Sequence, residues 1–275
     1  MKKLLTLITI FFTTFAFAED LRIVSVGGGV TETIYALGGQ QYLVGVDTTS
    51  TWPEEAKKLP QVGYQRSLAP EGILSLKPTY LIGTSHTGPE TTLQQIKTAG
   101  VNVVILPSEP KVKTIQERIQ KIAQILNKET AGSDLWLKVE DQLATAKLAQ
   151  VNKTETKKVL FLLVVPGRPA MVAGKNTEAD LMIQLAGGRN VVNDFDDYRV
   201  LTPEAIQALN PDVILVTDDG LQSLGGLEQL KLQPGIAQTN AAKNNKFISM
   251  DSNFLLNLGP RTGDAVVQLA KSLNN

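Results

Sequence analysis

The sequence contains no cysteine and only one histidine, His86. Without cysteine the chain cannot form disulfides or thiolate metal sites, and structural zinc needs several His or Cys ligands. A Ser-His-Asp triad would have to use His86, and no G-x-S-x-G turn precedes a helix. The chain therefore lacks the usual signatures of a hydrolase that uses a serine, a thiol or zinc.

An excess of charge of one sign is also lacking. The 27 basic and 27 acidic residues balance, and they are scattered along the chain. Nucleic-acid binding depends on clustered Lys and Arg side chains that face phosphates. We therefore expect no nucleic-acid partner.

The first residues predict a signal peptide over residues 1–18. Lys2 and Lys3 precede an apolar stretch over residues 4–17, and Ala16-Phe17-Ala18 has the small-x-small form of a cleavage site. The apolar stretch is shorter than the ~20 residues that a membrane-spanning helix needs. No cysteine follows that could carry a lipid. We therefore expect an exported chain, most simply in a bacterial periplasm.

The rest of the chain contains an internal repeat. Residues 70–78 and 203–211 share Pro, Glu, Ile, Leu and Pro in the same order and spacing, and each segment runs into an apolar stretch. Residues 34–39 and 183–188 form a second related pair, and each ends in Gly-Gly. The period is far longer than the roughly 20–50 residues of a solenoid unit. It predicts two similar lobes, and the cleft between them is a preferred place for a small-molecule site.

Strands alternate with helices in both halves, which predicts mainly parallel sheets covered by helices. The expected strands cover residues 23–26, 43–46, 80–82, 101–106, 159–165, 213–217 and 246–250. The expected helices cover residues 31–37, 91–98, 178–185, 203–209, 227–232 and 264–273. Between the first strand and helix, Gly27-Gly28-Gly29 lacks the Walker lysine and the G-x-G-x-x-G spacing, so it predicts a tight turn rather than a phosphate cradle.

A helical stretch lies between the two halves. In the run of about 129–151, Leu135, Val139 and Leu143 fall on one stripe. We expect this run to connect the lobes as a spine that resists hinge closure and leaves the cleft largely preformed. The expected fold is α/β, with two similar lobes of mainly parallel sheets, joined by a long rigid helix, and a ligand cleft between them. The expected domains are an N-terminal lobe over 19–127, a connecting helix over 128–153 and a C-terminal lobe over 154–275.

The loop before the first repeat carries the most distinctive candidate chemistry. Gly63 and Pro70 bracket it, and Tyr64 and Arg66 project from it two residues apart. Tyrosine is a known type of haem ligand, and a nearby cation favours the ionised phenolate. From the residues alone, an ordinary loop tyrosine packed on the surface remains an alternative.

The whole mature chain resembles the helical-spine class of substrate-binding proteins of ABC importers, which serves haem, iron-siderophores and cobalamin. The stretch Gly63-Tyr64-x-Arg66-x-Leu68, which leads into residues 71–78, is similar to the haem-carrying subgroup. Residues 172–177, 185–188 and 259–262 extend the resemblance over both lobes. It implies that Tyr64 is the axial iron ligand and that Arg66 supports it.

One departure from the subgroup concerns a second iron ligand. Some members carry a His after the first strand of the second lobe, and the corresponding residues 165–171 contain none. We therefore expect five-coordinate iron on Tyr64. The candidates for a second ligand, or for the cleft wall, are His86, Met171 and Tyr198. Arg168 and Arg199 are candidate partners of the haem propionates, because Arg pairs well with carboxylates, and solvated loop arginines are the alternative.

Glu71 and Glu204 occupy the same position in the two repeats, second in a Pro-Glu helix start. A carboxylate in a first helical turn complements the helix dipole. The resemblance implies a further role, in which one Glu from each lobe meets arginines of the membrane permease.

The expected function is that of a periplasmic carrier that binds haem b as its transported ligand and delivers it to an inner-membrane ABC permease dimer. We expect a monomer and no enzymatic activity. An iron-siderophore or a corrinoid is the alternative ligand. An exported α/β enzyme that acts in the cleft is the alternative from another class.

Overall fold

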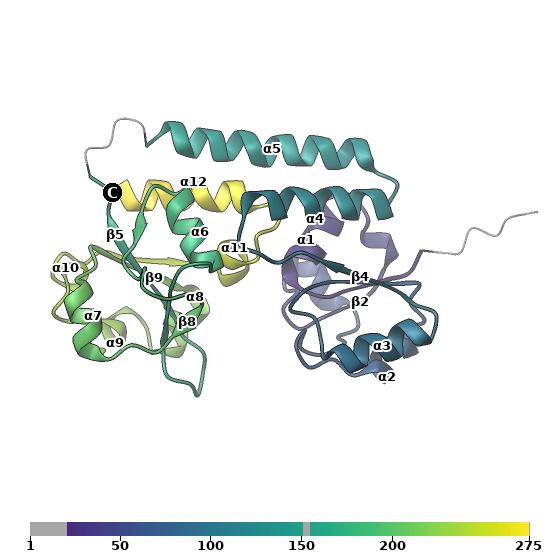
Figure 1. The fold of residues 1–275 in the computed structure, drawn as a ribbon, viewed down its shortest axis with the longest axis horizontal. Helices are drawn as coiled ribbons and strands as arrows, with labels where there is room; N and C mark the ends of the chain where they lie inside the picture. The colour runs from purple at the N-terminus through teal and green to yellow at the C-terminus, as the bar shows by residue number, and fades with distance from the viewer. Residues whose placement is uncertain (1–20, 151–154, 275) are drawn as a thin grey trace, which may run out of the picture.

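The computed structural model describes residues 21–150 and 155–274, so the expected signal peptide lies outside the described residues. The chain forms two α/β lobes side by side, with a layer of long helices across both (Figure 1). Within the described ranges, none of the helices combines the length and hydrophobicity needed to span a membrane.

The N-terminal lobe is built on a four-stranded parallel sheet in the order β2-β1-β3-β4. Side chains alternate between its faces. Ile23 and Ile82 pack in one buried cluster with α1 and α4, and Val24 and Leu81 pack in the other with α2 and α3. The elements are β1 Ile23–Ser25, α1 Gly28–Ala36, η1 Gln40–Tyr42, β2 Leu43–Val46, η2 Glu54–Lys58, α2 Pro70–Ser75, β3 Tyr80–Thr84, α3 Glu90–Thr98, β4 Asn102–Leu106 and α4 Val112–Ile125.

The C-terminal lobe has a mixed sheet in the order β10-β9-β5-β6-β8, with β7 also paired to β5. Strands β10, β9, β5 and β7 run parallel, whereas β6 runs antiparallel to both of its neighbours, β5 and β8. The elements are β5 Lys158–Leu163, β6 Met171–Ala173, α6 Glu178–Leu185, β7 Arg189–Asn190, β8 Tyr198–Arg199, α7 Pro203–Leu209, β9 Val213–Thr217, α8 Asp218–Ser223, α9 Leu227–Lys231, α10 Asn240–Lys243, β10 Phe247–Met250, α11 Ser252–Leu256 and α12 Thr262–Asn274. The expected strand over 159–165 thus ends at Leu163, because the chain turns back through a loop into β6.

The helical tie consists of α4, α5 Glu129–Leu148 and α12 rather than one helix alone. Helix α5 lies along both α4 and α12 (Figure 1). Ile119 of α4 and Val139 of α5 belong to the same buried cluster as Leu269 of α12 and Phe161 of the C-terminal sheet. The spine is therefore continuous with the core of the C-terminal lobe. The α/β, two-lobed prediction is confirmed, and the predicted domain boundaries remain a prediction.

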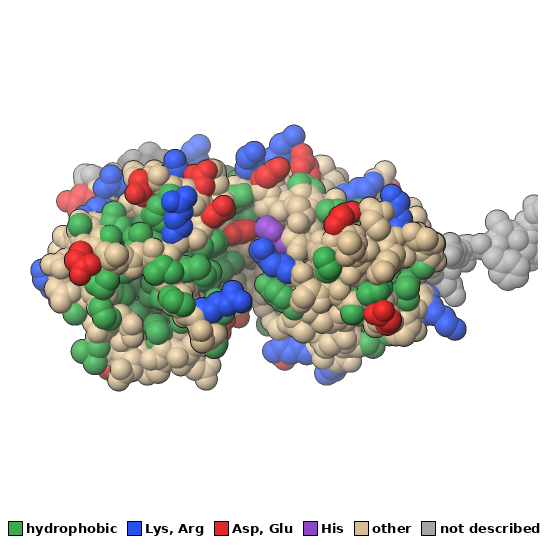
Figure 2. Space-filling view, turned by 60° about the horizontal axis from the view of Figure 1, so that its bottom comes forward, with side chains coloured by type: hydrophobic (Ala, Val, Ile, Leu, Met, Phe, Trp, Pro, Cys, Tyr) green, Lys and Arg blue, Asp and Glu red, His purple; other side chains and the backbone are tan. Residues whose placement is uncertain are grey.

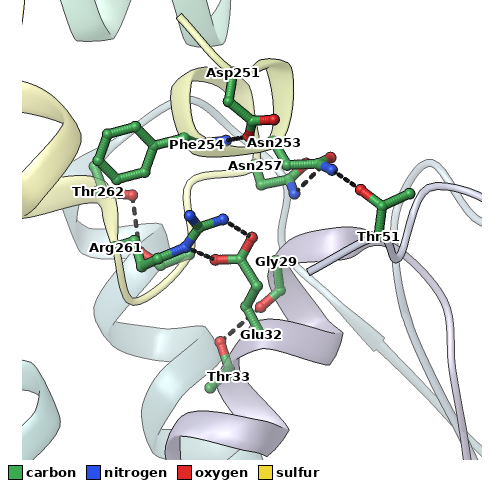
Figure 3. Close-up of polar contacts among 11 residues, drawn as sticks. Gly29, Glu32, Thr33, Thr51, Asp251, Asn253, Phe254, Asn257, Arg261 and Thr262 are labelled. Carbon is green, nitrogen blue, oxygen red and sulfur yellow. Dashed lines mark hydrogen bonds and ion pairs between the residues drawn. The ribbon is translucent and has the colours of Figure 1, made fainter. Parts of the chain in front are cut away.

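The lobes also meet below the spine, where α11 and the segment after it lie against α1 (Figure 3). Arg261 donates to both carboxylate oxygens of Glu32, at 3.0 and 2.6 Å, and Asn253 donates to the hydroxyl of Thr51. At Gly29, a Cβ atom would lie 2.5 Å from the backbone oxygen of Asn257. The glycine segment therefore allows close approach of the lobes, in addition to the turn that Gly27 makes with a φ of +101°.

Candidate functional site

The candidate site lies in the groove between the lobes, which Figure 2 shows at the centre of the molecule. Loops after the parallel strands β1 and β3 border it, as expected for ligand sites at the carboxyl ends of strands. A pocket of about 240 Å³ opens there between residues of both lobes. Its lining residues are Gly27 to Val30, Gln65, Arg66, Thr84, His86, Arg118, Glu178 and Leu256 to Leu258.

Tyr64 stands next to this pocket on a loop whose backbone is fixed. The Gly63 carbonyl accepts from the amide of Thr48 at 3.0 Å, and the Tyr64 carbonyl accepts from Ser67 at 2.9 Å. The Gln65 carbonyl accepts from Gly88 at 2.9 Å, which ties the loop to the segment after β3. With its backbone held in this way, the Tyr64 side chain is 47% exposed. Gln65 and Arg66, the next two residues, line the pocket.

His86 is half-buried on the same wall, and it meets the other lobe. Its Nε2 atom lies 4.0 Å from Oε1 of Glu178, the first residue of α6. Burial lowers the pKa of His86 below its ordinary 6.5, and the positive charges of Arg66 and Arg118 lower it further, against an opposing effect of Glu178. The imidazole is therefore neutral at pH 7.

Arg118 is a site residue that the sequence reasoning missed. It is only 6% exposed. Its Nε donates to the carbonyl of Pro107 at 2.7 Å, and its Nη1 donates to the carbonyls of Asn257 and Leu258 at 3.2 and 3.4 Å. Burial lowers its pKa to about 10, against the opposing charge of Glu178. The sequence does contain one sign of this role: Arg118 is a charged residue on the helix face that Ile115 and Ile119 mark as buried.

The C-terminal candidates do not line this pocket. Arg168 is exposed in the loop between β5 and β6, and Met171 is half-buried at the start of β6. Tyr198 lies in β8 with its ring edge-on to Phe161, 6.4 Å between centroids, and burial followed by the charge of Glu178 raises its pKa. Arg199 stacks 4.6 Å from the ring centroid of Phe195. The protonated, packed phenol of Tyr198 is poorly prepared to act as an iron ligand.

The two sides of the groove differ in character. Figure 2 shows hydrophobic side chains gathered on the C-terminal lobe, up to the groove, whereas the surface of the N-terminal lobe is mostly polar. Val200, directly after β8, is 57% exposed. The groove therefore has an apolar side on the C-terminal lobe, and the loop that carries Tyr64 belongs to the opposite lobe.

Larger depressions lie outside the groove. A depression of about 890 Å³ lies along β10 on the C-terminal lobe, and its lining includes Asp212, Lys246 and Phe247. One of about 420 Å³ lies beside Trp52 and Arg261 at the lobe contact. Neither contains a predicted ligand residue, so we assign the site to the smaller interlobe pocket.

Glu71 and Glu204 lie away from the groove. Both are exposed in the first turns of α2 and α7. These helices lie on the side of the two lobes opposite α5 (Figure 1). The pseudo-symmetric position that the repeat predicts is thus available to a partner on that side.

Two α/β lobes tied by helices, with a preformed pocket at their junction, define a two-lobed ligand-binding protein of the helical-spine kind. The chain belongs to the periplasmic binding protein family, whose family model matches residues 23–254. Membership confirms the resemblance stated above and the prediction of a binding protein rather than an enzyme.

The chain is similar to solved structures and to known proteins that bind haem or vitamin B12. The apo periplasmic heme-binding protein RhuT from Roseiflexus sp. RS-1 is 42% identical, with a TM-score of 0.89 over 93% of this chain and 98% of that one. The periplasmic heme-binding protein BhuT, in complex with two hemes, is 40% identical, with a TM-score of 0.87 over 92% and 97%. The vitamin B12-binding protein of Vibrio parahaemolyticus is 26% identical over 98% of this chain and 96% of its own.

Proposed function

We propose that this protein is a periplasmic carrier that binds haem b in the interlobe groove and delivers it to an inner-membrane ABC importer. The observation that carries the proposal is Tyr64, a half-exposed phenol on a fixed loop whose next two residues line the interlobe pocket. The similarity to two heme-binding proteins of 40% identity or more supports it.

In this proposal Tyr64 binds the haem iron as phenolate, which is an established type of haem ligation. The cation of Arg66 favours the ionised oxygen. The apolar wall of the C-terminal lobe covers the other porphyrin face.

The iron is proposed to be five-coordinate, with Tyr64 as its one protein ligand. His86 and Met171 are candidates for a second ligand. Tyr198 is the weakest candidate, because burial favours its neutral form. Arg168 and Arg199 are candidate propionate partners at the rim.

The test is an absorption titration of the purified mature protein with hemin, beside Tyr64→Ala and Tyr64→Phe. Both variants should lose the phenolate-iron spectrum and bind hemin at least tenfold more weakly, while their folding is unchanged because the side chain is exposed. Tyr42→Phe, in a half-buried tyrosine outside the pocket lining, is the matched control. An unchanged spectrum and affinity in Tyr64→Ala would show that Tyr64 is not the ligand.

A corrinoid is the second candidate ligand, because the Vibrio parahaemolyticus relative named above is a vitamin B12-binding protein. Cyanocobalamin is titrated under the same conditions as hemin. Tight cyanocobalamin binding that survives Tyr64→Ala, without hemin binding, would replace the haem proposal. Turnover of neither compound is expected.

Delivery requires a docking surface, and we assign it to Glu71 and Glu204. Each carboxylate is exposed at a helix start, and both helices lie on the face opposite the spine. Arginines of a permease dimer would pair with them, one from each half of the dimer. The carrier is proposed to act as a monomer.

A further inference from the structure

Charged groups gather where the two lobes meet in the groove. Arg66, His86, Arg118 and Glu178 all line the 240 Å³ pocket. In the proposed function the cation of Arg66 serves the Tyr64 phenolate. Arg118 is then the cation of this pocket that remains for a carboxylate of the ligand.

Arg118 is positioned as a preformed donor. Its Nε and Nη1 atoms are held by carbonyls of Pro107, Asn257 and Leu258, which belong to both sides of the junction. Within the described residues its Nη2 atom has no hydrogen-bond partner, and this atom is not fully buried. The guanidinium thus presents one free nitrogen to the pocket, and Arg is well suited to carboxylates.

Glu178 does not neutralise this guanidinium by contact. Among the described residues Glu178 forms an ion pair only with His86, at 4.0 Å. Its charge still acts on Arg118 across the pocket, since it opposes the lowering of the Arg118 pKa. The guanidinium of Arg118 and the carboxylate of Glu178 thus line the same pocket without forming an ion pair.

The pocket is smaller than the roughly 300–1,000 Å³ of ordinary small-molecule sites, so it fits one edge of a porphyrin rather than the whole ring. The propionates are the charged groups on that edge. Resting on the proposed function, we propose that Arg118, with His86 and Glu178 around it, forms a carboxylate subsite that holds one haem propionate at the lobe junction. Haem is then oriented with its propionate edge toward the junction, so His86 faces a propionate and is no longer a candidate for the second iron ligand. The second propionate is left to Arg168 and Arg199.

The first test compares hemin with its dimethyl ester, which keeps the iron and the ring but removes both carboxylate charges. Wild-type protein is titrated with each compound in the same mixed solvent at pH 7. The free acid should bind at least tenfold more tightly than the ester. Equal affinities would overturn the subsite, whereas failure of hemin itself to bind through Tyr64 would overturn the proposed function instead.

The second test measures the same acid-to-ester ratio in variants. Arg118→Gln should reduce the ratio to less than threefold without loss of the phenolate-iron spectrum. Lys113→Gln removes an exposed cation from the same helix and should leave the ratio unchanged. If a folded Arg118→Gln variant keeps the wild-type acid-to-ester ratio, the proposal is overturned, and Arg168 and Arg199 are the better candidates for the propionates.

Glu178→Gln tests the same subsite independently, should Arg118→Gln not fold. Removal of the negative charge across the pocket should raise the acid-to-ester ratio severalfold, because that charge repels the propionate. A ratio that stays constant or falls would contradict a propionate placed between Arg118 and Glu178.

Discussion

Replacement of Arg261 by Met should destabilise the protein by about 3–5 kcal/mol at pH 7, the usual cost of breaking a buried ion pair. The Glu32 side chain is 3% exposed and accepts two hydrogen bonds from Arg261, at 3.0 and 2.6 Å. Without its partner, Glu32 would remain as an uncompensated buried carboxylate. Arg261 also stacks 4.5 Å from the ring centroid of Trp52 and 5.0 Å from that of Phe254, which adds about 0.5–1 kcal/mol for each exposed contact.

The loss should depend on pH in a defined direction. Burial raises the pKa of Glu32 above 4.5, while Arg261 pulls it down, so removal of Arg261 raises it further. A group with a raised folded-state pKa contributes stability at low pH that is lost as the pH rises through that pKa. The difference between wild type and Arg261→Met should therefore be smaller at pH 5, where Glu32 takes up a proton more readily, than at pH 7.

Urea unfolding at pH 5 and pH 7 measures both effects. Arg189→Met, in an exposed arginine of β7, is the control and should change stability by less than about 0.5 kcal/mol. Glu32→Gln should cost less than Arg261→Met, because it leaves a partly exposed arginine rather than a buried carboxylate. A loss below 1 kcal/mol at pH 7, or an equal loss at both pH values, would refute the reasoning.

Two further predictions concern the lobe contact and docking. Gly29→Ala should destabilise the protein by about 1–3 kcal/mol in the same unfolding assay, because its Cβ would lie 2.5 Å from the Asn257 carbonyl oxygen; unchanged stability would mean that the lobes separate freely. Glu71→Lys/Glu204→Lys should sharply reduce haem uptake by cells while hemin binding in solution stays normal, since helix-start carboxylates contribute only about 0.3–1 kcal/mol to stability. Glu90→Lys, at the exposed start of α3, is the matched control, and normal transport by the double variant would remove the docking assignment.

Local signals in the sequence predicted the regular elements well where they were strong. The expected ranges 43–46, 178–185, 203–209 and 213–217 agree with β2, α6, α7 and β9. For the two helices the structure shows why, since Thr177 and Thr202 cap them by accepting from the amides of Asp180 and Ala205. Strands β6, β7 and β8 were missed, because two or three residues are too few to show a period and pairing with distant strands decides their conformation.

The candidate site could also be predicted from the sequence only in part. The loop with Tyr64 and Arg66 could be proposed from the sequence because its short motif resembles that of the haem-carrying subgroup, and its role as iron ligand stays a prediction. Arg118 and Glu178 were missed, because they lie far apart in sequence and meet only when the two lobes join. In the sequence, Arg118 stands out only as a charged residue on the buried face of a helix. Its hydrogen-bond partners are backbone carbonyls, which cannot be predicted from residue type.

The lobe contact and the charged pocket are one structural unit, which links stability to recognition. The carbonyls of Asn257 and Leu258 that hold Arg118 stand only a few residues before Arg261, in the same segment between α11 and α12. Loosening of Arg261 should therefore also release the guanidinium of Arg118 from its fixed position. In hemin titrations Arg261→Met should lose part of the preference for the free acid over the ester, even where the variant remains folded, whereas Arg189→Met should keep it. A destabilised Arg261→Met variant with an unchanged acid-to-ester ratio would show that the pocket holds its geometry independently of the lobe contact.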